Sequence, residues 1–190
     1  MIMQTKFIDK NIKYEGFQLS PHWIYKNFKI QGDAIVAFIG ECDVKLAEMV
    51  DIEDVINNEP IFSDKMLSFI EENFHSTLNE AIYRQRLLAG IVKDLIKEQF
   101  PEAKVTRDGD DVYLNDKKLT VSIATKSITS TLIHFGINID PTHAPVKAAG
   151  LETDLGIKDI KDFALKLMER YKSEVEDIDF AASKVRGVVE

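Results

Sequence analysis

The chain has 190 residues, of which 45% are hydrophobic and 29% charged, and its net charge is −8 at pH 7. This length and balance predict one α+β domain over residues 1–190 with a hydrophobic core, and they exclude a fibrous or disordered chain. Because nucleic-acid binding needs Lys and Arg to neutralise phosphates, an acidic chain without a basic run is not expected to bind nucleic acid or an anionic membrane.

Cysteine content and hydropathy predict the compartment. Cys42 is the only cysteine, so the chain cannot form an intrachain disulfide. Residues 1–10 lack the apolar core of a signal peptide, and no stretch approaches the roughly 20 apolar residues of a membrane span. We therefore expect a cytoplasmic protein without membrane association.

The first half of the chain alternates between expected strands and helices. Residues 33–39 form a continuous apolar run that ends at Gly40, which is typical of a buried strand. Residues 51–60 are acidic and polar and indicate a turn with a short helix. The spacing of apolar side chains over residues 63–74 predicts a further helix, with Ser63 as its N-cap.

The middle of the chain contains the clearest helical pattern. Apolar residues recur on one face over residues 88–98, with charged residues opposite, and Pro101 ends the helix. Residues 104–107 and 112–114 then predict two short strands. Asn115–Asp116 predicts a hairpin turn, although the glycine that usually follows the asparagine is absent.

Two later segments alternate between polar and apolar residues, as half-buried strands do. Their apolar positions are Leu119, Val121 and Ile123, and then Ile133, Phe135, Ile137 and Ile139. The positions between them are Lys118, Thr120 and Ser122, and then Leu132, His134, Gly136 and Asn138. If the strands pair as a hairpin, one surface gathers a cation, hydroxyls, an imidazole and an amide.

Such a surface could bind a carboxylate, a phosphate or an acyl carbonyl, with Lys118 stabilising developing negative charge. Gly136 would allow a ligand to approach the backbone closely. The solvated face of a half-exposed sheet produces the same alternation, so the pattern alone leaves both interpretations open.

The C-terminal part is predicted to be helical. An apolar stripe over residues 160–171 indicates one helix, and residues 173–186 indicate a further one. Strands and helices interleave irregularly along the chain, which favours an α+β fold with a mainly antiparallel sheet flanked by helices.

Motifs over about half the chain resemble biotin/lipoate protein ligases and octanoyltransferases. They are, in order, Leu87–Lys97, Ala103–Arg107, Asp110–Leu119, His134–Asn138 and Ala144–Leu155. The resemblance places Lys118 at the lysine that contacts the substrate carboxyl, and Asp111 at a turn aspartate. Residues 14–19 with Trp23, and residues 82–87, also resemble an uncharacterised archaeal family that shares this fold.

The resemblance implies a protein that binds a small carboxylic acid, or its activated acyl form, in a pocket centred on Lys118. If it is an enzyme, it would be an acyltransferase or a carboxylate ligase, with an acyl-carrier protein as a further candidate partner. No metal is expected, no cofactor is identified, and a homodimer is one candidate assembly. The implied catalytic residues are Lys118, His134 and Asn138, and the implied ligand-binding residues are Asp111, Arg84, Arg86, Thr120, Ser122 and Gly136.

The chain also departs from these families at residues that their chemistry requires. Val146 stands where octanoyltransferases have the acyl-accepting cysteine, and Cys42 lies far away in sequence. Val121 replaces a small glycine of biotin ligases, and the glycine-rich adenylate loop is missing. An alternative is therefore a non-catalytic binding or interaction protein that kept the fold but lost the nucleophile and the adenylate loop.

Overall fold

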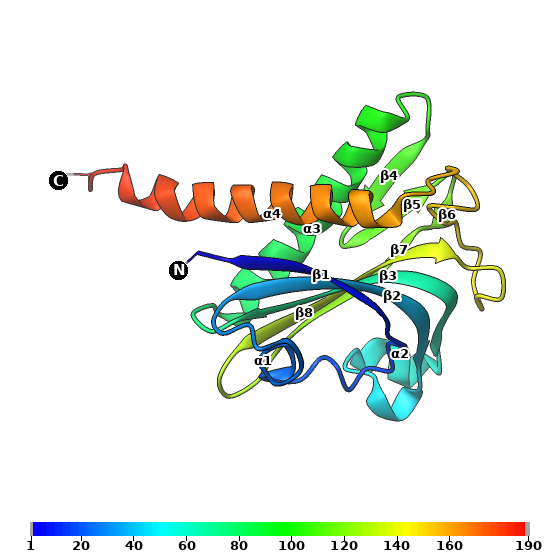
Figure 1. Cartoon of the computed structure of the whole chain (residues 1–190), viewed down its shortest axis with the longest axis horizontal. Coiled ribbons are helices and arrows are strands. Elements are labelled where there is room, and N and C mark those ends of the chain that lie inside the picture. Colours follow the sequence, from blue (N-terminus) through cyan, green and yellow to red (C-terminus); the bar gives the residue numbers. More distant parts are fainter. Residues whose placement is uncertain (1, 189–190) are drawn as a thin grey trace.

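The protein is built on a five-stranded sheet with helices on both faces, and a computed structural model describes residues 2–188 (Figure 1). In chain order, the strands of this sheet are β1 Gln4–Asn11, β2 Ala34–Val44, β3 Ile61–Asn73, β7 Thr120–Lys126 and β8 Thr131–Asp140. They are ordered β1-β2-β3-β8-β7 across the sheet, and only β1 and β2 run parallel. The predicted α+β class with a mainly antiparallel sheet is confirmed.

One face of the sheet packs against two long helices and a small second sheet. The helices, which lie above the large sheet in Figure 1, are α3 Leu78–Gln99 and α4 Ile160–Ser183. The second sheet consists of β4 Val105–Asp108, β5 Asp111–Leu114 and β6 Lys117–Lys118. Leu88, Phe135 and Tyr171 are among the fully buried side chains of this first core.

The opposite face is covered by the two segments that connect β1 to β2 and β2 to β3. The first contains α1 Trp23–Phe28, and the second contains a 3-10 turn Leu46–Glu48 and α2 Ile52–Asn57. Tyr14 and Trp23 pack with Phe38, Met66 and Ile70 of the sheet into a second core. The polar positions of β8 therefore face a covered layer and not solvent.

The helix predicted over residues 63–74 is wrong, because this segment belongs to β3, which hydrogen-bonds to β2 and β8. Met66 and Ile70 pack in the second core, whereas Leu67 and Phe69 pack in the first. A central strand that is covered on both faces carries apolar side chains at odd and at even positions. Its pattern can therefore imitate helical spacing.

The other predicted elements differ from the structure mainly in their ends. α3 begins well before residue 88, at a capping box in which Thr77 and Glu80 satisfy each other's backbone N–H groups. The C-terminal part is one helix and not two, because Val175 continues the buried stripe of α4 beyond Tyr171. Within residues 2–188, no helix combines the length and apolar character needed to cross a bilayer.

Candidate functional site

A cavity of about 240 Å³ opens on the second-core side of the sheet, next to β6. Its floor comes from Met66 of β3, Val121 of β7 and Asn138 of β8. Its walls come from the α2 region, the turn before β5 and residues 144–148. Since pockets for drug-sized ligands measure about 300–1,000 Å³, this cavity suits a smaller molecule.

Lys118 supplies the cationic side chain among the described residues that line this cavity. Backbone hydrogen bonds fix its strand, since Lys118 N donates to Lys147 O at 3.0 Å and Ala149 N donates to Lys118 O at 2.9 Å. Lys118 Nζ lies 2.9 Å from Asp111 Oδ2, and about a third of its side chain, 32%, is exposed. Burial lowers the pKa of Lys118, but the hydrogen bond and charge of Asp111 outweigh it, so the ammonium group keeps its proton.

Carboxylates outnumber this single cation along the lining. They are Asp51, Asp54, Glu59, Asp110 and Asp111. Asp51 caps α2 by accepting hydrogen bonds from the backbone N–H groups of residues 53 and 54. The sequence pattern gave no role to Asp51, Asp54 or Glu59; the acidic composition of residues 51–60 was the signal that could have indicated them.

Asn138 and Gly136 lie on the floor side of the sheet, as their alternation with the apolar residues of β8 predicts. Asn138 is only 5% exposed, lines the cavity, and donates a 3.4 Å hydrogen bond from Nδ2 to Lys118 O. A Cβ atom on Gly136 would lie 2.3 Å from Met66 Sδ. The absence of a side chain at this glycine therefore makes room for the sulfur of Met66.

Thr120 and Ser122 do not share a face with His134 and Gly136, so the predicted arrangement of the two strands is wrong. Thr120 pairs with Ile137, and Ser122 pairs with Phe135. Since directly opposed residues of an antiparallel pair point to the same side, both hydroxyls lie on the first-core face. The two-residue strand β6 ends at Lys118, and β7 begins only after Leu119, so the alternation does not run unbroken from Lys118.

The two hydroxyls have structural partners within the fold. Thr120 is buried, and its Oγ1 accepts a hydrogen bond from Val112 N at 2.9 Å. Ser122 reaches the cavity wall, where its Oγ donates to Asp110 Oδ2 at 2.8 Å. Gln85 Nε2 donates to both of these oxygens at 2.8 Å, which fixes the turn before β5 against α3.

His134 lies beneath the second layer and not in the lining of the Lys118 cavity. Its ring stacks on Tyr14 with 3.6 Å between ring centroids, and its Nε2 is 3.2 Å from Ser68 Oγ. Burial alone lowers the pKa of His134 to about 3, so the imidazole is neutral near pH 7. Both residues of the stack line a separate small cavity of about 40 Å³, whose walls include Val121.

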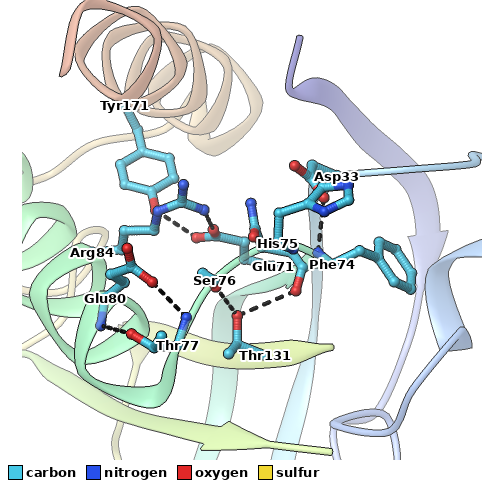
Figure 2. A network of polar contacts seen from close by, with 11 residues as sticks. Asp33, Glu71, Phe74, His75, Ser76, Thr77, Glu80, Arg84, Thr131 and Tyr171 are labelled. Carbon is cyan, nitrogen blue, oxygen red and sulfur yellow. Dashed lines mark hydrogen bonds and ion pairs between the residues drawn. The ribbon is translucent and has the colours of Figure 1, made fainter. Parts of the chain in front are cut away.

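Arg84 and Arg86, which the resemblance implied to be ligand-binding residues, both hold carboxylates of the chain itself. Arg84 Nη1 lies 3.1 Å from Glu71 Oε1, and the hydroxyl of Tyr171 donates to the other oxygen of the same carboxylate (Figure 2). Arg86 Nη1 lies 3.1 Å from Asp110 Oδ1 at the edge of the Lys118 cavity. Of the two, only Arg86 is close to the cavity.

Val146 and Cys42 lie in different environments. Val146 is exposed and lines the cavity, at the position where the resembling transferases carry a thiol. Cys42 is buried in the second core, where burial raises the pKa of its thiol to about 12. Since the thiolate is the nucleophile, this cysteine is unsuited to covalent catalysis.

Comparison with known proteins identifies relatives along nearly the whole chain. A family profile described as "Domain of unknown function (DUF366)" matches residues 3–186. Uncharacterized protein MJ0805 of Methanocaldococcus jannaschii is 39% identical over 183 residues, which cover 93% of this chain and 81% of that protein. The structure of a protein of unknown function from Pyrococcus horikoshi matches with a TM-score of 0.91 at 38% identity, covering 98% of this chain and 100% of the other.

More distant structures include complexes with biotin and with lipoate. A mutant biotin protein ligase of Aquifex aeolicus in complex with biotin matches with a TM-score of 0.58 at 15% identity, covering 92% of this chain and 70% of the ligase. LipL1 of P. falciparum in complex with lipoate matches with a TM-score of 0.52 at 10% identity, covering 99% of this chain and 64% of LipL1. Identities this low show the fold alone, and they confirm the predicted ligase-like fold. The chain belongs to the DUF366 family, whose members here include uncharacterised archaeal proteins, and it has the fold of the biotin/lipoate protein ligases.

Proposed function

We propose that the protein binds a small carboxylic acid, or its activated acyl form, in the Lys118 cavity. The observation that carries this proposal is the Lys118 ammonium group, which is held at the rim of a small cavity by Asp111 and by fixed backbone. A protonated amine so placed can donate hydrogen bonds to a carboxylate or to an acyl oxygen, and partial burial strengthens the attraction.

The remaining lining of the cavity fits the rest of such a ligand. Met66, Val121 and Phe62 offer apolar surface to a short hydrocarbon chain. Asn138 is positioned to orient a polar group beside Lys118. The ligase fold, which in two distant relatives holds biotin or lipoate, adds support by analogy only.

A binding protein without catalytic activity is the second candidate, and Val146 favours it. A valine side chain at the rim cannot accept an acyl group, and Cys42 is buried elsewhere. If the protein is an acyltransferase or carboxylate ligase, Lys118 would stabilise the developing oxyanion while the ligand or an acyl-carrier partner supplies the nucleophile. His134, which lies outside this cavity, would then make no direct contact with the ligand.

Replacing Lys118 with methionine is expected to weaken binding of octanoate, lipoate or biotin about tenfold or more, because a hydrogen bond to a charged group contributes about 1.5–3 kcal/mol. Thermal shift followed by calorimetry measures this effect. Lys117→Met is the matched control, since the neighbouring lysine pairs with Asp154 at 2.8 Å and lies outside the cavity.

Equal affinity of the wild type and of Lys118→Met for the acid that binds would contradict the proposal. Release of pyrophosphate from ATP in the presence of that acid, or acylation of a carrier protein, distinguishes the enzyme from the binding protein. Binding with neither reaction would support the non-catalytic candidate.

A further inference from the structure

Asp54 places a carboxylate in the Lys118 cavity without a counter-charge of its own. It belongs to the first turn of α2 and lines the cavity together with Lys118 and Asp111. Burial, followed by the charge of Asp51, raises the pKa of Asp54, and the charge of Lys118 only partly opposes this. Among residues 2–188, no side chain donates a hydrogen bond to this carboxylate.

The other nearby charges are largely matched, so the excess of negative charge is concentrated at α2. Lys118 is paired with Asp111 at 2.9 Å, and Arg86 is paired with Asp110 at 3.1 Å. Asp54 therefore lies in a negative potential that a positive group of a ligand would neutralise.

Asn138 adds a second polar side chain to the cavity lining, and only one end of its amide has a protein partner. The residue is only 5% exposed, and its Nδ2 makes one long hydrogen bond, to Lys118 O. Within the described part of the chain, no group donates to its Oδ1. An amide oxygen without a donor from the protein can accept a hydrogen bond from a ligand, so this atom also favours a ligand that brings an N–H or O–H group.

The apolar part of the lining favours an organic cation over a metal ion. Phe62, Met66 and Val121 present hydrocarbon and sulfur to the same space as the carboxylates. Magnesium and calcium take oxygen ligands and bound water, whereas an alkyl ammonium ion needs apolar surface beside its carboxylate.

We propose that the cavity selects small carboxylic acids that also carry a protonated amine, with the amine at Asp54 and the carboxylate at Lys118. This inference rests on the proposed function and names its substrate class, an amino-substituted short-chain acid. It also gives a role to the acidic α2 segment, which lines the cavity together with the lysine.

Matched ligands test this proposal directly. Butanoate, hexanoate and octanoate are compared by calorimetry with their α-amino and ω-amino derivatives, and hexylamine reports on the amine alone. We expect the best amino acid of the series to bind about tenfold or more tightly than its unsubstituted parent, given one charge-assisted hydrogen bond. Asp54→Asn should abolish that preference, whereas Glu53→Gln, an exposed carboxylate on the same helical turn, should preserve it.

Three outcomes would overturn the inference. These are a wild type without preference for the amino derivatives, a preference that survives in Asp54→Asn, and stabilisation by Mg²⁺ or Ca²⁺ in place of the amino acids. Unsubstituted acids that bind through Lys118 would leave the proposed function intact while this inference fails. Amino derivatives whose binding depends on Asp54 but not on Lys118 would contradict the proposed function and the placement of the carboxylate at Lys118, and would leave only amine recognition by Asp54.

Discussion

Replacing Arg84 with methionine is expected to lower the free energy of unfolding by about 3–5 kcal/mol, because it leaves the buried carboxylate of Glu71 without its cation. The side chain of Glu71 is 2% exposed, and Arg84 and Tyr171 reach it from α3 and α4 (Figure 2). Burial raises the pKa of Glu71 against the opposing charge of Arg84. Denaturant unfolding at pH 7 measures the loss, which should be smaller in acid, where the carboxyl group takes up a proton.

The double variant Glu71→Leu with Arg84→Met separates the buried charge from general damage to packing. Removing both partners should recover much of the lost stability, since a buried ion pair can often be replaced by apolar side chains. Arg86→Met is the surface control: its pair with Asp110 has side chains that are 41% and 29% exposed, so about 0–1 kcal/mol is expected. A double variant as unstable as Arg84→Met would contradict this assignment.

Acidification is expected to destabilise the protein through His134. The pKa of His134 is about 3 in the folded protein and 6.5 in an ordinary environment. Between these two pH values the imidazole is protonated in the unfolded chain and neutral in the folded one. The contribution of neutral His134 to the free energy of unfolding is therefore complete above pH 6.5 and is lost as the pH falls toward 3. At about 1.36 kcal/mol per pH unit, the loss between pH 7 and pH 5 is about 2 kcal/mol.

His134→Gln should flatten this slope, even though losing the stack on Tyr14 lowers stability at every pH. Denaturant unfolding at pH 7, 6 and 5 gives the slope for each variant. His143→Gln is the control, because Asp64 raises the pKa of the exposed His143 whereas burial lowers that of His134. Removing the His143 imidazole should therefore not reduce the loss of unfolding free energy in acid. An unchanged slope in His134→Gln would show that another group causes the acid sensitivity.

The hydrophobic pattern correctly predicted the elements that bury only one face. The helix after residue 88 was predicted because one stripe of α3 faces the core, and Leu88, Val92 and Ile96 are fully buried there. The turn at Asn115–Asp116 was also predicted, and both residues adopt the positive φ values that a tight hairpin requires, 50° and 63°. Lys118 and Asp111, the two residues that the resemblance singled out, form an ion pair at 2.9 Å.

The signals failed where long-range packing decides the structure. The strand β3 appeared helical because layers that are remote in sequence cover both of its faces. The predicted shared face of Thr120 with His134 was wrong because the register of β7 and β8 pairs Thr120 with Ile137 and His134 with Ile123. The acidic composition of residues 51–60 was visible in the sequence, but no local pattern showed that Asp54 lines the same cavity as Lys118. His134 is also buried, because the second core covers the face of the sheet on which it lies.

Methionine-methyl NMR during an octanoate titration tests most directly whether the Lys118 cavity is the binding site. Met66 forms part of the cavity floor, whereas Met3 and Met168 lie in the first core. We expect the Met66 signal to move with octanoate in the wild type and to need about tenfold or more octanoate to move as far in Lys118→Met, while Met3 and Met168 stay unchanged in both. Binding that leaves Met66 unmoved, or a Met66 titration curve that is the same with and without Lys118, would contradict the proposed site.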